Sequence, residues 1–104
     1  MAAIVWARPA RNQLQAIVAY IALDSTAAAA RLYARILDAP KRLASFPASG
    51  SIVAEFNSPE IREIYCGSYR IVYWMRDEEC RIVAVVHGAR NFLRAVNRAE
   101  WEID

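Results

Sequence analysis

Four residues in the second half of the chain have side chains that bind anions or transfer protons: Glu63, Arg70, His87 and Arg90. Arginine presents a planar fork of N–H donors that suits phosphate and carboxylate groups, and histidine exchanges a proton near neutral pH. In this set Arg70 and Arg90 would hold an anionic group, while His87 would carry a proton or donate a hydrogen bond. The set is a candidate site for chemistry on an anion.

The same residues also have a purely structural interpretation. Glu63 beside Arg70 fits an ordinary cross-strand ion pair, which stabilises a sheet by roughly 0.2–1 kcal/mol. His87 fits a hydrogen-bonded structural role. The choice between the two interpretations depends on the elements that position these side chains.

Hydrophobic spacing predicts a strand, two helices and then a run of strands. Leu14, Ile17 and Ile21 repeat at helical intervals, and the polar stretch 24–26 can cap a second helix. Pro40 should end that helix, because proline in a helix interior costs about 3 kcal/mol or more. The predicted elements are a strand at 3–6, helices at 10–23 and from 27–30 to Pro40, strands at 61–66, 69–76 and 80–88, and a short helix at 91–98.

This order predicts one α+β domain over residues 1–104. The N-terminal strand and the α-helical hairpin should pack on one face of a small antiparallel β-sheet meander, followed by a short C-terminal helix. Residues 52–60 are ambiguous, and Pro59 ends any strand there.

Turn length fixes which strand residues lie opposite each other. A two-residue turn at Gly67-Ser68 would place Tyr65 opposite Arg70, and one at Glu78-Glu79 would place Arg70 opposite His87. One end of one face would then carry Glu63, Tyr65, Arg70 and His87. The middle of that face would carry Val72, Trp74, Val83 and Val85, an apolar patch that predicts contact with a partner.

Composition excludes several classes of protein. The chain has 104 residues, of which 57% are hydrophobic, so it should fold as one domain and not remain disordered. Its net charge of +2 is far from the strongly basic balance of a protein that grips nucleic acid through many phosphates. We find neither an apolar run of about 18 residues nor a charged leader before an apolar stretch, so we expect a cytoplasmic protein.

The two cysteines, Cys66 and Cys80, have no metal-ligand spacing, and a single histidine cannot complete a zinc site. We expect both thiols to be reduced and buried. We assign no metal, no cofactor and no redox role.

Five stretches, by their order and spacing, resemble the RelE/ParE superfamily of toxins, which are the toxin halves of bacterial type II toxin–antitoxin systems. They are QAIVAYI (15–21), FPASG (46–50), IRE (61–63), YRIVY (69–73) and VVHGAR (85–90). The resemblance covers nearly the whole chain. It implies a small antiparallel sheet with an N-terminal helical hairpin, in agreement with the predicted elements.

The superfamily has two activities: RelE-like members cut mRNA on the ribosome, and ParE-like members inhibit DNA gyrase without a known catalytic site. The RelE-type arginines fall on Arg70 and Arg90 of this sequence. The two RelE lysines fall on Ile61 and Glu63, and its late tyrosine falls near Val96, so these three are missing. Cleaving a phosphodiester needs converging positive charge and proton carriers, and an acidic residue in place of a lysine opposes this.

Other RelE-like enzymes use a glutamate, an arginine and a terminal histidine, and Glu63, Arg70 and His87 match that set in type. The H-x-x-R ending from His87 to Arg90, however, resembles the ParE branch. The favoured hypothesis is therefore a ParE-like gyrase inhibitor that acts by protein–protein contact. The alternatives are an mRNA interferase using Glu63, Arg70, His87 and Arg90, and a non-toxic remnant that only binds an antitoxin.

All three hypotheses imply a cognate antitoxin, a ParD-like protein of ribbon-helix-helix type whose amphipathic tail lies along the helical hairpin. The resemblance implies a toxin–antitoxin heterotetramer or larger assembly, with no direct DNA binding by this chain alone. The segment from Asn91 to Asp104 is either a contact element or a helix that closes the core. The candidate partner-binding residues are Leu14, Ile17, Tyr20, Tyr33, Trp74, Phe92, Leu93 and Trp101.

Overall fold

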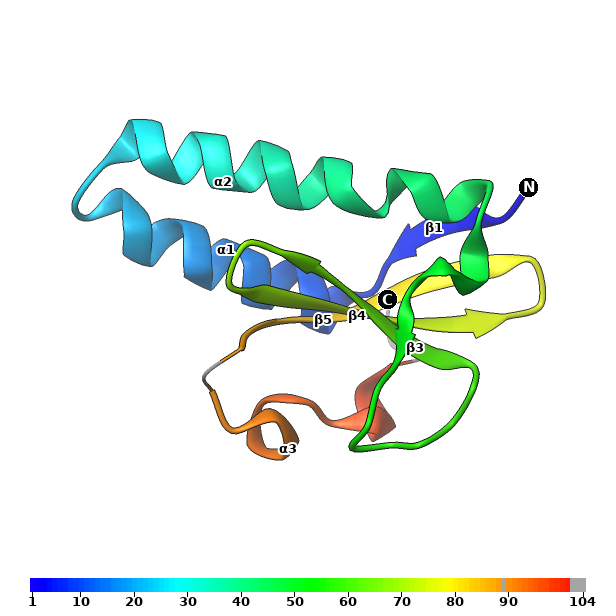
Figure 1. The fold of residues 1–104 in the computed structure, drawn as a ribbon. Coiled ribbons are helices and arrows are strands. Elements are labelled where there is room, and N and C mark those ends of the chain that lie inside the picture. Colours follow the sequence, from blue (N-terminus) through cyan, green and yellow to red (C-terminus); the bar gives the residue numbers. More distant parts are fainter. Residues whose placement is uncertain (89, 102–104) are drawn as a thin grey trace.

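The computed structural model describes residues 1–88 and 90–101. Its elements are β1 (Ala3–Trp6), α1 (Arg8–Ala22), α2 (Thr26–Asp38), β2 (Ser51–Ile52), β3 (Ile61–Cys66), β4 (Tyr69–Arg76), β5 (Glu79–His87), α3 (Phe92–Ala95) and 3₁₀ helices at Ala39–Ala44, Pro47–Ser49 and Arg98–Glu100. The helical hairpin α1–α2 covers one face of the sheet, and the segment containing α3 covers the other (Figure 1). The predicted α+β architecture is confirmed.

The helical hairpin follows the local signals in its sequence. Pro9 occupies the first turn of α1, where its missing N–H costs nothing. The Ser25 side chain caps α2 by accepting a hydrogen bond of 3.0 Å from the Ala28 N–H. The α-helix ends at Asp38 and the chain continues as a 3₁₀ turn through the buried Pro40, so the predicted stop is confirmed.

The sheet has the order β1-β5-β4-β3-β2. Strands β3, β4 and β5 form the predicted antiparallel meander, with β2 on its outer edge. β1 pairs in parallel with β5, so the sheet is mixed and not wholly antiparallel. The helical hairpin between β1 and the later strands supplies the crossover that a parallel pair requires.

The first predicted hairpin register is confirmed, and the second is wrong. Tyr65 lies opposite Arg70 across the Gly67-Ser68 turn. The next turn is instead Asp77-Glu78, with Asp77 in the left-handed region at φ 57°. Asp tolerates this conformation better than most residues.

A bulge then adds Val83 to β5, because Val72 lies opposite Ala84 whereas Tyr73 lies opposite Ile82. These two differences place His87 opposite Tyr69 and leave Arg70 opposite Val86. The predicted pairing of Arg70 with His87 is therefore wrong.

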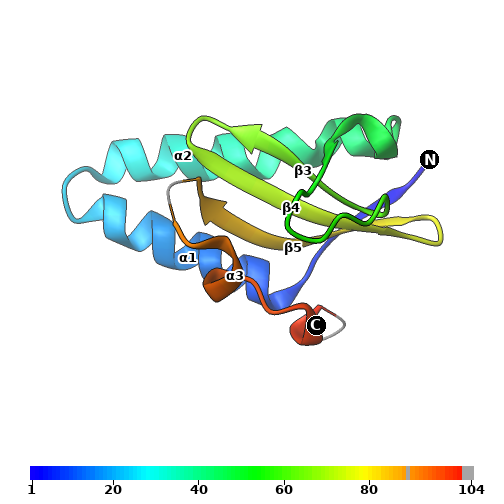
Figure 2. The same ribbon diagram turned by 60° about the horizontal axis from the view of Figure 1, so that its bottom comes forward.

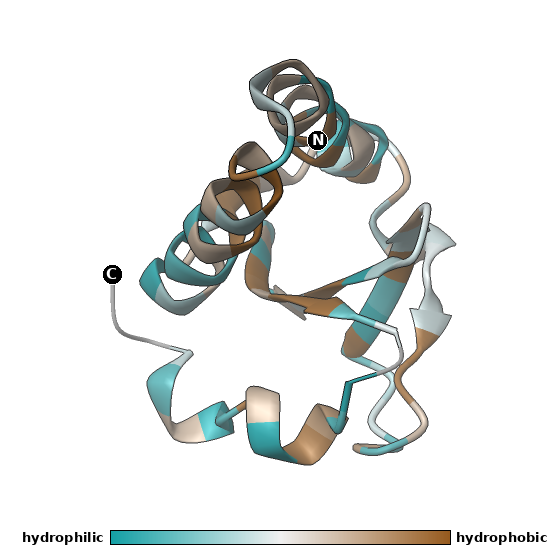
Figure 3. Cartoon of the chain, turned by 90° about the vertical axis from the view of Figure 1, so that its left-hand side faces the viewer, coloured by the Kyte–Doolittle hydropathy of each residue, from teal (hydrophilic) through white to brown (hydrophobic). Residues whose placement is uncertain are grey.

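The sheet lies between the helical hairpin and the C-terminal segment, residues 91–101 (Figures 2 and 3). A hydrophobic cluster fills the space on each side of it. One lies beneath α1 and α2 and includes Leu14, Ile36 and Tyr73. The other lies beneath the C-terminal segment and includes Phe92 and Trp101. None of the described helices is long and apolar enough to cross a membrane.

The apolar patch predicted on the outer face is covered by the chain itself. Val72, Val83 and Trp74 pack with Phe92 and Trp101. Val85 lies in the other layer, against the helices, because the bulge reverses the alternation along β5. The patch is therefore not an open partner site, and residues 91–101 close the core, as one of the two interpretations of this segment predicted. Residues 102–104 lie outside the described residues.

Candidate functional site

Arg70 on β4 lies at the centre of an ion-pair network. Its Nε donates to Glu63 Oε1 at 2.5 Å, and its two terminal nitrogens donate to both carboxylate oxygens of Glu55 at 2.9 and 3.0 Å. The Arg70 side chain is 11% exposed, that of Glu63 8% and that of Glu55 29%. One guanidinium is thus shared by two carboxylates in a largely enclosed place.

An aromatic ring completes the enclosure of Arg70. Its guanidinium carbon lies 4.2 Å from the centre of the Phe92 ring, a cation–π contact. The hydrogen bonds to Glu55, with those to Glu63, raise the pKa of Arg70 further above its ordinary value. The hydrogen bond from Arg70 lowers the pKa of Glu55 below 4.5. The guanidinium of Arg70 therefore finds its hydrogen-bond acceptors within the chain, at Glu55 and Glu63.

His87 lies on the other face of the sheet from this network. It pairs with Tyr69, whose side chain packs against the helical layer. The two rings meet edge to face with their centres 5.3 Å apart. The predicted cluster of Glu63, Arg70 and His87 is corrected, because the one-residue bulge in β5 carries His87 to the opposite face.

Arg90 follows β5 and lies with His87 at a pocket on the helix side of the sheet. The four predicted site residues therefore divide into two places: Glu63 and Arg70 share the network, and His87 and Arg90 share the pocket. Glu55, which completes the network, falls in the stretch 52–60 that sequence patterns left unassigned. The sequence shows that residue 55 is a glutamate, but no hydrophobic periodicity or turn motif in this stretch indicated that it would contact Arg70.

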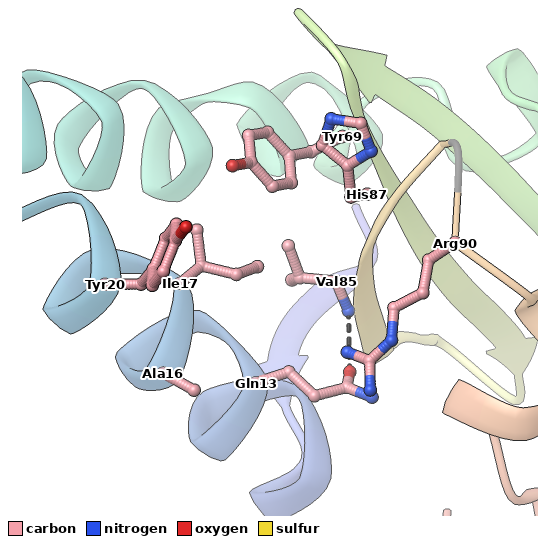
Figure 4. A pocket seen from close by; sticks show the side chains of 8 residues that line it. All are labelled: Gln13, Ala16, Ile17, Tyr20, Tyr69, Val85, His87 and Arg90. Atoms are coloured by element: carbon pink, nitrogen blue, oxygen red, sulfur yellow. Dashed lines mark hydrogen bonds between the residues drawn. The ribbon is translucent and has the colours of Figure 1, made fainter.

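The pocket has a volume of about 380 Å³ and lies between α1 and the ends of β4 and β5 (Figure 4). Gln13 forms one side of it and is held by two hydrogen bonds. Its Oε1 accepts from the Val85 N–H at 2.9 Å, and its Nε2 donates to the Ala95 carbonyl at 2.7 Å. One amide thus joins α1, the edge of β5 and the C-terminal segment.

Comparison with known protein families identifies the family of this chain. Residues 4–92 match the family described as the ParE toxin of type II toxin–antitoxin system, parDE. The chain belongs to the ParE toxin family. The resemblance to the ParE branch of the RelE/ParE superfamily is confirmed.

A solved structure agrees with this ParE fold. It is described as the chromosomal ParDE TA system from P. aeruginosa, and it matches with a TM-score of 0.70 and 20% sequence identity. The match covers 84% of this chain and 96% of the other. A search of curated proteins found no match.

The partner-binding residues predicted for this ParE chain fall into three groups by burial. Leu14, Phe92 and Trp101 are buried in the core. Their assignment to a partner surface is therefore corrected, because their side chains already pack against other apolar residues of the same chain. Ile17 and Trp74 are partly buried. The residues with exposed side chains are Tyr20, Tyr33 and Leu93.

The cysteines of the ParE chain are free thiols in the core, as predicted. Burial raises the pKa of Cys80, which disfavours the reactive thiolate. Among residues 1–88 and 90–101, no group of three or more His, Cys, Asp or Glu side chains is arranged to hold a metal ion.

Proposed function

We propose that this member of the ParE family inhibits DNA gyrase by protein–protein contact and that a ParD-like antitoxin neutralises it. The observation that carries the proposal is the state of Arg70, the RelE-type arginine on the sheet. It is bound by Glu55 and Glu63 and covered by Phe92. A phosphodiester approaching this face would meet carboxylates, which repel it.

RNA cleavage would also require a proton carrier beside the cation. His87, the candidate for that role, lies on the opposite face of the sheet. The two parts of a RelE-like site are therefore separated by the sheet itself. This separation favours a toxin that acts by occupying a surface of another protein.

The proposal includes the partners and the place of action. A ribbon-helix-helix antitoxin is a dimer, so we expect it to carry two copies of this chain in a heterotetramer. Gyrase acts on chromosomal DNA, which places the toxin in the cytoplasm. Light scattering of the purified complex would measure the stoichiometry.

Two assays run side by side test the proposed target. Purified toxin is added to gyrase, ATP and relaxed plasmid, and separately to a reconstituted translation system with a defined mRNA. We expect blocked supercoiling and intact mRNA. Cleaved mRNA with unchanged supercoiling would overturn the proposal, and growth unaffected by expression without antitoxin would indicate a non-toxic remnant.

The variant Arg70→Met sharpens this comparison, since an arginine that stabilises a cleaving phosphodiester cannot be replaced by an apolar side chain. We expect the variant, assayed below its unfolding temperature, to inhibit gyrase as the parent does. Loss of mRNA cleavage in Arg70→Met, with gyrase unaffected by either protein, would favour the interferase.

A further inference from the structure

We propose that residues 91–101 form a strap that opens away from the sheet and closes over it as one unit, with the side-chain amide of Gln13 as its latch. The strap contains α3 and the 3₁₀ helix at Arg98–Glu100, and it lies on the face of the sheet opposite to the helical hairpin (Figure 1). The movement belongs to this chain alone and requires neither gyrase nor antitoxin, so it goes beyond the proposed function.

The backbone hydrogen bonds of the strap lie within the strap. The Val96 N–H donates to the Phe92 carbonyl at 3.0 Å, and the Trp101 N–H donates to the Arg98 carbonyl at 3.2 Å. Among residues 1–88 and 90–101, no backbone-to-backbone hydrogen bond joins the strap to a strand of the sheet. A strand that leaves a sheet breaks a ladder of such bonds, whereas the described part of this strap separates from the strands without breaking any.

Aromatic side chains hold the strap closed. Phe92 and Trp101 are buried, and both meet the ring of Phe56 edge to face, with ring centres 5.8 and 5.4 Å apart. Trp101 also packs against Trp74, with ring centres 5.9 Å apart. Because Phe92 and Trp101 lie at opposite ends of the strap and share one ring, releasing either end loosens the other. The strap therefore opens as a unit and not residue by residue.

The sheet keeps a complete hydrophobic cluster when the strap opens. The cluster between the sheet and the helical hairpin includes Ile36, Ile71 and Tyr73, and it contains no residue of the strap. The hairpin and the strands therefore stay packed together in the open form. Elements of a protein that are packed in this independent way open at different free energies.

Opening leaves the charge of Arg70 with its partners. Phe92 covers the guanidinium, whose carbon lies 4.2 Å from the centre of the ring. The hydrogen bonds of that guanidinium go to Glu55 and Glu63, which lie outside the strap. When the strap opens, water replaces Phe92 and the ion pairs persist. The large cost of a buried charge without compensation therefore does not oppose the opening.

The boundary between the strap and α1 is incompletely packed. A cavity of about 190 Å³ lies there, with Pro9 and Asn12 on the α1 side and Val96 and Trp101 on the strap side. Atoms that line a cavity lose the dispersion contacts that close packing supplies. Less attraction therefore has to be overcome when the strap leaves α1 than at a fully packed boundary.

The amide of Gln13 fastens the strap to α1. Its Nε2 donates to the Ala95 carbonyl at 2.7 Å, while its Oε1 accepts from the Val85 N–H and fixes the direction of the amide (Figure 4). Opening breaks the bond to Ala95 and leaves the bond to Val85 in place. Because Gln13 belongs to α1, a shift of α1 changes how firmly the strap is held. The latch thus couples the two faces of the sheet.

Native-state hydrogen exchange of the full chain, followed by NMR in low concentrations of urea, tests the opening. A helix as short as α3 does not persist alone, so the Val96 and Trp101 amides exchange whenever the strap opens. We expect these two amides to share one opening equilibrium constant, at least about tenfold larger than that of the β4 amides, and to depend less on urea. An opening constant and urea dependence equal to those of β4 would overturn the inference, and so would unrelated openings at Val96 and Trp101.

The variant Gln13→Glu tests the latch, because a carboxylate still accepts from the Val85 N–H but has no N–H to donate to Ala95. If the bond to Ala95 exists only in the closed form, the opening constants of the strap and of β4 should both rise by about tenfold, since both openings start from the weakened closed form. Unchanged strap exchange would overturn the role of Gln13, whether or not β4 exchange changes. The matched control is Gln15→Glu, an exposed position on the same helix, which should change either constant by less than about twofold.

Discussion

Arg70 and Glu63 lie diagonally across the β3–β4 ladder, and the Arg70 Nε donates to Glu63 Oε1 at 2.5 Å. The pair is almost fully buried beneath the C-terminal segment, where Phe92 covers the guanidinium. An ion pair in this position differs from one at the surface, because removing one partner leaves a buried charge without compensation.

The first prediction concerns Arg70→Met. We expect a loss of about 3–5 kcal/mol in the free energy of unfolding, since Glu63 would remain buried and unpaired. Urea denaturation monitored by circular dichroism measures it. The matched control is Lys41→Met, which breaks the Lys41–Asp38 pair whose side chains are about three-quarters exposed and should cost less than about 1 kcal/mol. Equal losses in the two variants would contradict the network's structural role.

The second prediction concerns stability at acid pH. Arg70 lowers the pKa of Glu55 in the folded chain below 4.5, its value in the unfolded chain. The unfolded state therefore binds more protons near this pH, and the contribution of Glu55 to stability is present above pH 4.5 and lost as the pH falls through the folded pKa. Unfolding free energies measured from pH 7 to 3 should fall more steeply for the parent than for Glu55→Gln. Parallel curves would show that Glu55 contributes nothing to the acid response.

The third prediction concerns closure of the sheet by the C-terminal segment. Trp101 is 1% exposed and packs edge to face with Phe56. We expect Trp101→Ala to lower the unfolding free energy by about 3–5 kcal/mol, as other large core truncations do. Leu93→Ala, in the same segment but exposed, should cost less than about 0.5 kcal/mol. If Trp101→Ala were equally mild, the segment would not be part of the core.

The fourth prediction concerns the bridging amide of Gln13. Gln13→Leu removes the acceptor for the Val85 N–H and the donor for the Ala95 carbonyl. Leaving these backbone groups without partners should cost about 1–3 kcal/mol. Hydrogen exchange followed by NMR should show faster exchange at the Val85 amide, and Gln15→Leu, on the exposed side of α1, should not change it. Unaltered protection of Val85 in Gln13→Leu would refute the bridge.

Much of the fold followed from local sequence signals. The helical spacing of Leu14 and Ile17 located α1, and the ring of Pro40 stopped α2 because it cannot continue an α-helix. Gly67-Ser68 fixed the first hairpin, so the register that brings Tyr65 opposite Arg70 was predictable. The Glu63–Arg70 ion pair followed from that register.

The candidate site was only partly predictable, because a single residue changed its composition. The extra Val83 in β5 moved His87 to the helix side of the sheet, whereas the moved turn at Asp77-Glu78 changed only its partner strand residue. A bulge has no strong local signal, and strand alternation converts a one-residue shift into a change of face. Sequence spacing therefore predicted that His87 lies opposite Arg70, whereas in the structure the two side chains lie on opposite faces of the sheet.

The sequence by itself determined most of the elements and the first hairpin, because periodicity, proline sterics and turn chemistry act over a few neighbouring residues. Its motifs also carried the resemblance to the toxin family. Only the tertiary structure decided that Glu55 binds Arg70, that His87 and Arg90 share a pocket with α1, and that Phe92 and Trp101 cover the sheet. These contacts join segments far apart in the chain. Burial of apolar surface and pairing of buried charges select them, and both depend on the whole packed arrangement.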